Sequence, residues 1–369
     1  MNSLSFRKSF LPLALVFLFL GACGDDDPVA PSAPLWVEVE LNLPPGHSQL
    51  WAIDFNGGQG LTLGISGIWN AYWLAENLFF KLQPDGTWLP ADLGVMPTRT
   101  IFRDLALDPV GKPVLAGVQG TGPPSVLLDF RGTDPELFTR NTRGLFAVEG
   151  QGSFMVAGGW AMGGDLWTST SAGAWNMDDV TPPMTGTNDS GFRDVAIRGE
   201  RAVACGFDDG ADTLQVILER TTATEWTKVE LQGQSYRTFY CVALSENGAI
   251  FVGGIERAGS PGSKAFLTQR TANGLWADLI LPDPEGLRGV NDILIASDNT
   301  IYLACAGEDY NARGSLLHAQ PTGVWKEINS FSGGLLQVAE ADNGDIYAVG
   351  FRRHESTGTE TAVMFRKTP

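Results

Sequence analysis

Residues 239–281 read FYCVALSENGAIFVGGIERAGSPGSKAFLTQRTANGLWADLIL, and this stretch decides the fold class. Two apolar runs, 240–244 and 249–253, flank a turn that ends in Asn-Gly, a pair typical of a tight β-hairpin. A third run at 264–270 leads through a second Asn-Gly pair to a fourth run, which begins at Trp276. The stretch therefore predicts four short antiparallel strands in chain order.

The same order of segments recurs with a period close to 50 residues. Six tryptophans open the fourth strand of a unit or lie in the same context: Trp36, Trp88, Trp175, Trp226, Trp276 and Trp325. The last four are separated by 51, 50 and 49 residues. A fixed period of this length, made of short strands, indicates a repeat architecture. We expect a tryptophan that recurs at one strand position to pack between neighbouring sheets and not to bind a ligand.

Seven such units fit along the chain. We expect their first strands to begin near Leu50, Phe102, Leu145, Phe192, Phe239, Val290 and Leu335. We expect their second strands to end near Gly64, Gly117, Gly158, Gly206, Gly253, Ala304 and Gly350. The seventh unit lacks a fourth strand, and a spare strand of that kind, residues 35–41, precedes the first unit. This match predicts an all-β fold: a seven-bladed β-propeller of four-stranded antiparallel blades over residues 35–369, closed by the N-terminal strand, which completes the last blade.

One turn before a fourth strand carries a family resemblance. Residues 84–88, Pro-Asp-Gly-Thr-Trp, resemble the Asp-box (Ser/Thr-x-Asp-x-Gly-x-x-Trp) of sialidase-type repeats, without its leading Ser or Thr. The other units keep little more than the Gly and the Trp of this motif. The resemblance implies a propeller of the kind found in sialidases, in photosystem assembly factors and in many envelope proteins. It carries over no active site.

The first 22 residues form a separate segment that resembles a bacterial lipoprotein signal peptide. Arg7 and Lys8 precede an apolar run at 10–20, which is too short to cross a bilayer as a helix. The run ends in Leu-Gly-Ala-Cys, and the resemblance implies that Cys23 receives lipid and becomes the new N-terminus. An ordinary secretory signal followed by an unmodified Cys23 is the alternative interpretation.

Residues 23–34 are predicted to be the lipidated cysteine and a flexible tether. Three aspartates at 25–27 precede a segment with prolines at every third position, a composition typical of a solvated spacer. The acidic run also resembles surface-export signals of lipoproteins in some Gram-negative groups; a plain spacer is the alternative. We expect a lipid-anchored protein of the bacterial cell envelope, at the outer membrane or the cell surface.

The charge balance restricts the partners. The chain has 25 Lys and Arg against 42 Asp and Glu, a net charge of −17, and removal of Arg7 and Lys8 with the signal would make it −19. Such a surface repels nucleic acid and anionic headgroups, so we expect no nucleic-acid partner and a membrane contact through the N-terminal lipid alone. We expect the protein to be a monomer.

Three cysteines remain beside Cys23, and an odd number does not indicate a disulfide framework. Cys205, Cys241 and Cys305 all lie in apolar, strand-like contexts, which predicts buried thiols. A disulfide between Cys205 and Cys241 is the alternative in an oxidising compartment.

The connections between second and third strands are long and differ from unit to unit, as binding loops on a repetitive scaffold often do. Their aromatic and charged residues are the ligand-binding candidates: Trp69, Tyr72, Trp73, Trp160, Glu308, Asp309, Tyr310 and Arg313. Clustered aromatic side chains suit a sugar or a partner protein. Trp69 and Trp73 have an alternative role as local core of their own unit.

Two sets of carboxylates are further candidates. Asp104, Asp194 and Asp292 lie at equivalent positions of first strands, where we expect the mouth of a central channel. They are expected to hold a cation or to accept backbone N–H bonds from the neighbouring blade. Asp208, Asp209 and Asp212 supply oxygen ligands suited to Ca²⁺ but lack a recognisable loop spacing, and a solvated acidic loop is the alternative.

The sequence shows no strong sign of catalysis. Its three histidines fall in different units without metal-ligand spacing, and no nucleophile elbow, phosphate loop or zinc motif is present. We therefore predict a non-catalytic binding or scaffolding propeller for an envelope protein or a glycan, with no cofactor. The alternative is a carbohydrate-active enzyme, a glycoside hydrolase or lyase, that uses carboxylates on the loop-bearing face.

Overall fold

The computed structural model describes residues 36–67, 75–94, 96–120, 124–161, 164–176, 190–209, 213–222, 225–229, 231, 237–257, 263–271, 273–282, 289–305, 313–319 and 325–368. Pro34–Pro369 forms one compact unit. Within the residues just given the regular elements are all β strands, and they include no helix long and apolar enough to cross a membrane. The segment 1–22, Cys23 and the tether to residue 34 lie outside the described residues.

Three sheets consist of four consecutive strands in chain order. The first contains β2 (Ser48–Asn56), β3 (Gln59–Ser66), β4 (Glu76–Leu82) and β5 (Trp88–Pro90). The second contains β6 (Thr100–Leu107), β7 (Pro113–Gln119), β8 (Ser125–Asp129) and β9 (Glu136–Arg140). The third contains β18 (Arg237–Leu244), β19 (Ile250–Arg257), β20 (Ser263–Arg270) and β21 (Trp276–Leu279). All neighbouring strands are antiparallel, as the alternation of short apolar runs and turns predicts.

A larger sheet joins two groups of four strands. The first group is β10 (Gly144–Gln151), β11 (Phe154–Ala161), β12 (Asp165–Ser171) and β13 (Ala174–Asn176). The second group is β14 (Ser190–Arg198), β15 (Arg201–Asp209), β16 (Thr213–Thr222) and β17 (Glu225–Lys228). Trp160 pairs with Gly191 and Ala161 with Ser190, so the strand pairing that joins the two groups into one sheet lies where β11 ends and β14 begins.

The last sheet contains β22 (Val290–Ile295), β23 (Ile301–Cys305), β24 (Arg313–Ala319), β25 (Trp325–Glu340), β26 (Ile346–Arg353), β27 (Glu360–Lys367) and β1 (Val37–Glu38). β25 is 16 residues long and is the fourth strand of one group and the first strand of the next. Its first half pairs with β24 and its second half, from Gly333 onward, pairs with β26.

The two ends of the described chain are hydrogen-bonded to each other. β1 is antiparallel to β27, with Val37 opposite Arg366 and Glu38 opposite Phe365. The backbone N–H of Val39 also donates to the carbonyl oxygen of Met364 over 2.8 Å. β1 thus pairs with β27 in the sheet that contains β25, β26 and β27.

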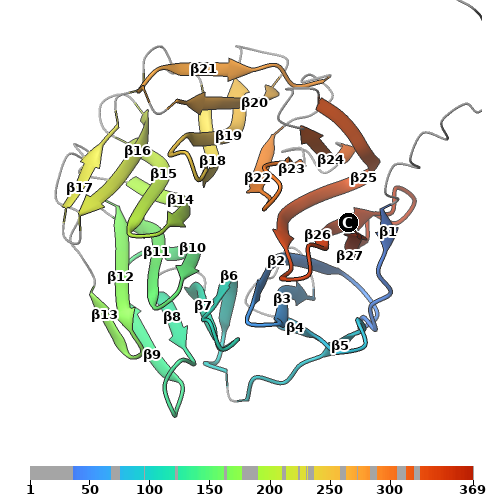
Figure 1. The fold of residues 1–369 in the computed structure, drawn as a ribbon. Coiled ribbons are helices and arrows are strands. Elements are labelled where there is room, and N and C mark those ends of the chain that lie inside the picture. The colour runs from blue at the N-terminus through green and yellow to red at the C-terminus, as the bar shows by residue number, and fades with distance from the viewer. Residues whose placement is uncertain are drawn as a thin grey trace, which may run out of the picture. The chain divides into compact units, whose positions relative to one another are not determined.

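The first strands of the groups lie together (Figure 1), with β6, β10, β18 and β22 among the strands nearest the centre. Each first strand contacts the first strand of the next group, in the order β2, β6, β10, β14, β18, β22 and β25, and β25 contacts β2 in turn. Apolar side chains of successive groups share their cores; Phe239 and Val203, for example, lie in one cluster. The sheets therefore pack face to face around a common centre.

Every one of these first strands carries a β-bulge near its start. The extra residues are Trp51, Arg103, Phe146, Arg193, Tyr240, Asn291 and Leu336. The residue opposite the bulge is Gly64, Gly117, Gly159, Gly206, Gly254, Cys305 or Gly350. The bulge explains the recurrent glycine, because the first-strand carbonyl approaches it closely: a Cβ on Gly206 would lie 1.9 Å from the Gly191 oxygen.

The predicted structural role of the repeated tryptophan is confirmed where its side chain is described. Trp88 is 3% exposed and packs edge-on against Tyr347 of β26, with ring centroids 5.7 Å apart. Trp36 packs in the same way against Tyr302 of β23, at 6.2 Å. Trp226 and Trp276 join core clusters that contain residues of the preceding group. These rings therefore fill the space between neighbouring sheets.

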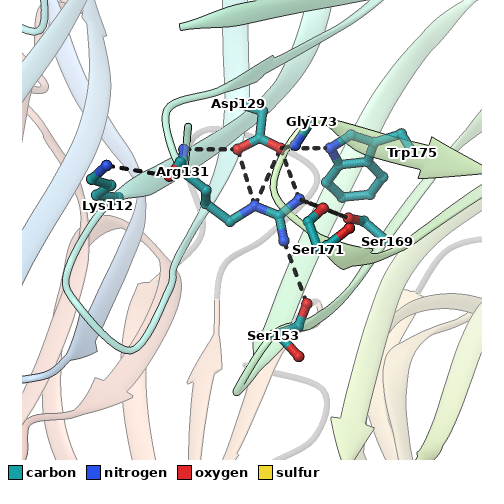
Figure 2. Close-up of polar contacts among 8 residues, drawn as sticks. All are labelled: Lys112, Asp129, Arg131, Ser153, Ser169, Ser171, Gly173 and Trp175. Atoms are coloured by element: carbon teal, nitrogen blue, oxygen red, sulfur yellow. Dashed lines mark hydrogen bonds and ion pairs between the residues drawn. The ribbon is translucent and has the colours of Figure 1, made fainter. Parts of the chain in front are cut away.

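Trp175 makes the corresponding contact through a buried ion pair (Figure 2). Its Nε1 donates to Asp129 Oδ2 over 2.9 Å, and the Arg131 guanidinium lies 5.3 Å from its ring centroid. Arg131 Nη2 is 2.7 Å from Asp129 Oδ2 and also donates to Ser169 Oγ over 2.8 Å. Burial acts to raise the pKa of Asp129, but the hydrogen bonds from Arg131 and Trp175 outweigh it and hold that pKa below its ordinary value. The pair is well satisfied and joins β8 to the β12–β13 turn.

The three described cysteines, Cys205, Cys241 and Cys305, are buried thiols outside any disulfide. Burial raises the pKa of the Cys205 and Cys241 thiols well above the ordinary value. The prediction of buried thiols is confirmed, and the alternative disulfide between Cys205 and Cys241 is not formed.

The bulge geometry generates a test of the fold. We expect Gly206→Ala to lower the free energy of unfolding by about 3 kcal/mol or more, because the new Cβ meets backbone atoms that the sheet holds in place. Gly132→Ala is the matched control, since its Cβ would lie 3.3 Å from the nearest atom. Guanidinium unfolding of both variants measures the difference; equal losses would contradict the proposed close approach.

Candidate functional site

One face of the sheets carries the candidate site. Because consecutive strands are antiparallel, the connections between second and third strands leave from the same end as the starts of the first strands. We call this side of the molecule the loop face. Gly67 and Ala75, which flank the connection between β3 and β4, lie on it, and so do Ala161 and Gly164, which flank the connection between β11 and β12. The tight turns at Gly57-Gly58 and Gly152 lie on the opposite face.

The aspartates predicted at the channel mouth connect neighbouring first strands. Asp104 Oδ2 accepts the Val148 N–H of β10 over 2.8 Å, and Asp194 Oδ2 accepts the Val242 N–H of β18 over 2.7 Å. Asp292 Oδ2 accepts the Val338 N–H of β25 over 2.8 Å. The other oxygen of each accepts the N–H of the following residue. These contacts fit the structural interpretation of the three residues, and a bound cation stays a prediction.

Three further polar side chains belong to the same central group. Asp54 Oδ2 accepts the Leu107 N–H over 2.7 Å, and Gln337 Oε1 accepts the Ile53 N–H, so both also link neighbouring first strands. Gln337 Nε2 lies 3.4 Å from Asp104 Oδ1. Glu149 of β10 is the third. Asp54 and Glu149 lie two residues after Ala52 and Ala147, the positions in β2 and β10 that are equivalent to Asp104. Because side chains two residues apart on a strand point to the same side, this alternation could have revealed them.

The central carboxylates are partly desolvated and repel one another. Burial raises the pKa of Asp104 to about 8 and the charges of Asp292 and Asp54 add to the rise, while the N–H bonds from Val148 and Leu105 oppose it. Burial likewise raises the pKa of Asp54 to about 7 and that of Asp292 to about 6.

The pKa of Glu149 is raised well above its ordinary value by burial, then by the charges of Asp54, Asp104 and Asp194. The mutual influence of these groups indicates that they converge on one space although their strands belong to different sheets. Among the described residues, no group of three or more His, Cys, Asp or Glu has an arrangement that could hold a metal ion.

A row of aromatic and arginine side chains follows the loop face across five successive groups, from β2 to β18. We call it the aromatic–arginine belt, and its members in order are Trp51, Arg103, Phe146, Trp160, Phe207, Arg193 and Tyr240. The Arg103 guanidinium lies 5.5 Å from the Trp51 ring centroid and 4.9 Å from that of Phe146. The Phe146 and Trp160 centroids are 6.0 Å apart.

The second half of the belt continues across the next sheets. Trp160 packs edge-on against Phe207, with centroids 5.5 Å apart. The Arg193 guanidinium lies 5.8 Å from the Phe207 centroid and 4.7 Å from that of Tyr240. Arg143 adds a further guanidinium 5.5 Å from the Trp160 centroid.

Five members of the belt are the extra residues of first-strand bulges: Trp51, Arg103, Phe146, Arg193 and Tyr240. Bulges re-aim side chains, and here they bring these residues together near the strand starts. Six members are half-buried and Arg193 is exposed. Trp160 was predicted as a binding residue, and Phe207 of β15 was not. The five bulge residues were missed because the sequence does not reveal the bulge.

The remaining predicted loop residues are not brought into this site by the described structure. Trp69, Tyr72 and Trp73, and Glu308, Asp309 and Tyr310, lie outside the described residues; Arg313 begins β24, but its side chain also lies outside them. Of the proposed Ca²⁺ set, Asp208 is fully buried and accepts the Ser190 hydroxyl over 2.9 Å. The Asp209 side chain and Asp212 are outside the described part, so the Ca²⁺ site stays a prediction.

Comparisons with known proteins show the fold. The WD40 propeller domain of Doa1 superposes with a TM-score of 0.59 at 11% identity, covering 91% of this chain and 97% of that one. The propeller domain of the Trilobed protease from Pyrococcus furiosus gives 0.54 at 10% identity, covering 87% and 95%. A protein of unknown function from Dyadobacter fermentans gives 0.53 at 13% identity, covering 91% and 98%. The chain folds as a β-propeller.

The likeness is one of fold alone, because the identities are low. No family model matches the sequence, and no curated protein matches it. The resemblance to sialidase-type repeats and to a lipoprotein signal therefore stays a prediction from the sequence.

The central carboxylates generate a pH test. Raised pKa values mean that the folded state keeps protons that the unfolded chain releases, so their contribution to stability falls as pH rises from about 4 to about 8. We expect Glu149→Gln to raise the free energy of unfolding at pH 8 and to change it little at pH 5.

Urea unfolding at the two pH values measures this difference. Glu200→Gln, at an exposed turn position, is the control and should change stability at neither pH. A gain of the same size at pH 5 and pH 8 would contradict like-charge repulsion as its cause.

Proposed function

We propose that this protein is a non-catalytic binding or scaffolding propeller that holds a partner protein on its loop face. The observation that carries the proposal is the aromatic–arginine belt. Tryptophan, tyrosine and arginine are the residues that contribute most to binding energy at protein interfaces. The belt sets them in one row on rigid strands, so binding would require little ordering of the protein.

The proposal includes the architecture that presents the belt: seven four-stranded blades in a ring closed by β1. Support comes from the pairing of Val37 with Arg366 and from the contacts of each first strand with the next, including β25 with β2. Trp36 packs against the preceding group as the other fourth-strand tryptophans do. The Pyrococcus furiosus propeller is described as having an open velcro topology, so similarity of fold alone does not fix how the ring closes.

A protein partner suits the belt better than a glycan. Sugars stack on open aromatic faces, whereas Arg103 lies over Trp51 and Phe146, and Arg193 lies over Tyr240. The exposed Arg193 guanidinium carries donors suited to carboxylates or carbonyl groups of a protein surface. The acidic balance of the chain argues against nucleic acid.

The carboxylates also favour binding over glycoside chemistry. A pair for acid–base catalysis needs oxygens that reach the substrate. The two oxygens of Asp104, and likewise those of Asp194, are occupied by backbone N–H groups of two strands. These groups therefore serve the scaffold.

The belt can be tested by substitution. We expect the double variant Trp160→Ala, Tyr240→Ala to reduce capture of envelope proteins by immobilised residues 35–369 at least tenfold, as expected for loss of two interface anchors. Ile280→Ala is the matched control, because Ile280 is an exposed apolar residue outside the belt. Quantitative mass spectrometry of the captured proteins gives the readout, with a glycan array run in parallel. Unchanged capture by the double variant, or binding of glycans alone, would overturn the proposed site.

We further propose that the propeller is anchored to a bacterial envelope membrane through lipid on Cys23, on the support of the Leu-Gly-Ala-Cys sequence. We expect Cys23→Ser to abolish incorporation of labelled fatty acid and to move the protein from the membrane fraction to the soluble fraction. Cys305→Ser is the control, since that thiol is buried. Retention of label in Cys23→Ser would contradict the assignment.

A further inference from the structure

A line of hydrogen-bonded side chains connects the last strand of the chain to the first member of the belt. It lies where β2 contacts β27 (Figure 1), a place that we call the seam. Trp51 Nε1 donates to Gln49 Oε1 over 2.6 Å, and Gln49 Nε2 donates to Glu360 Oε2 over 2.6 Å. Gln49 and Glu360 are buried, at 4% and 5% exposed. We call Glu360, Gln49 and Trp51 the Trp51 relay.

The chemistry of the two ends explains the residue in the middle. An indole N–H can only donate and a carboxylate can only accept, so the residue between them must accept on one side and donate on the other. The amide of Gln49 does both with two separate atoms of one planar group. Its oxygen therefore faces Trp51 and its nitrogen faces Glu360, and no other orientation of the amide satisfies both neighbours.

The repeat itself does not require an amide at this position. The equivalent positions of the other first strands that supply belt residues are Ile101, Gly144, Gly191 and Thr238. The other tryptophan of the belt, Trp160, has a buried Nε1 with no hydrogen-bond partner among the described residues, so packing holds that ring. Gln49 is therefore particular to the group that carries Trp51.

Two restraints act on the Trp51 indole, one at its nitrogen and one at its ring. The relay fixes the nitrogen, and the Arg103 guanidinium lies 5.5 Å from the ring centroid. Hydrogen bonds in a line polarise one another, so a carboxylate at the far end strengthens the bond to the indole. The same polarisation makes the ring more negative and favours its contact with the guanidinium. The two restraints therefore support each other.

We infer that Glu360 and Gln49 are positioning residues of the partner site on the loop face, which hold Trp51 in the orientation that the partner meets. The inference rests on the proposed function, because Trp51 belongs to the belt. A side chain that is held in advance loses little freedom when a partner binds. The last strand of the chain contributes to binding in this way through a buried residue, without contact with the partner.

The indole N–H resonance of Trp51 tests the relay without any partner. In ¹⁵N-labelled residues 35–369 it is the indole cross-peak that Trp51→Phe removes. Gln49→Met keeps the length of the side chain but removes its amide, so we expect the cross-peak to move upfield as the indole loses its acceptor. Glu360→Gln keeps an acceptor for Gln49 Nε2 and should leave the cross-peak nearly in place. An unmoved cross-peak in Gln49→Met would overturn the relay.

Capture of envelope proteins by the same immobilised variants tests the positioning role. We expect Gln49→Met to weaken capture roughly fivefold, since the freed indole must then be ordered on binding. Glu360→Gln should capture as the parent does.

Ser48→Ala is the matched control at the seam. Ser48 is 2% exposed, and its Oγ accepts the Ala362 N–H over 3.0 Å, so it joins the same two strands without being a member of the relay. We expect this variant to unfold at a lower urea concentration and to leave both the cross-peak and the capture unchanged. An equal loss of capture in Ser48→Ala would show that stability of the seam is the cause and would overturn the positioning role.

Failure of this inference and failure of the proposed partner site are distinguishable. If the belt variant Trp160→Ala, Tyr240→Ala leaves capture unchanged, the partner site is overturned. If that variant abolishes capture while Gln49→Met does not weaken it, the partner site stands and the positioning role of the relay is overturned.

Discussion

The rest of the molecule depends on the bulge in each first strand and on the close approach of the opposite residue. The bulge brings a carbonyl so near to the second strand that a Cβ on Gly206 or Gly350 would lie only 1.9 or 2.0 Å from its oxygen, far inside van der Waals contact. Glycine therefore recurs there for steric reasons and not because the turn requires a positive φ. The same bulge increases the local twist, which lets the strands incline around a common centre.

The first-strand bulge determines where two sets of side chains lie. The extra residue turns toward the loop face, where five such residues enter the aromatic–arginine belt. The residue after it turns toward the centre, where Asp104, Asp194 and Asp292 accept N–H groups of the next first strand. The sheets are thus fixed to one another by polar contacts at the centre and by tryptophans further out, and the belt lies on a scaffold with little freedom to move.

Much of the fold could be predicted because each unit repeats the same order of strands. The strand order, the spacing of the tryptophans and the spare N-terminal strand all depend on local sequence, and the structure places Trp88, Trp175 and Trp276 between sheets as expected. The belt and the Trp51 relay were not predictable, because they depend on which residues become neighbours across different sheets. Arg103 and Phe146 are 43 positions apart in sequence, and only the shared bulge brings their side chains within 4.9 Å. Glu149 was missed although the alternation of side chains places it on the same side of β10 as Ala147, the position equivalent to Asp104.

The central carboxylates show how the same residues can hold a scaffold together and limit its stability. Each backbone N–H bond to Asp104 favours the ionised form, whereas burial and the neighbouring acids favour the protonated form, and burial prevails. A propeller built only for stability would place apolar or amide side chains there, as Ala52, Ala147 and Gln337 do in other first strands. Gln337 Nε2 lies 3.4 Å from Asp104 Oδ1, and their strands, β25 and β6, are not successive in the order of first strands, so this polar contact at the centre joins sheets that are not immediate neighbours.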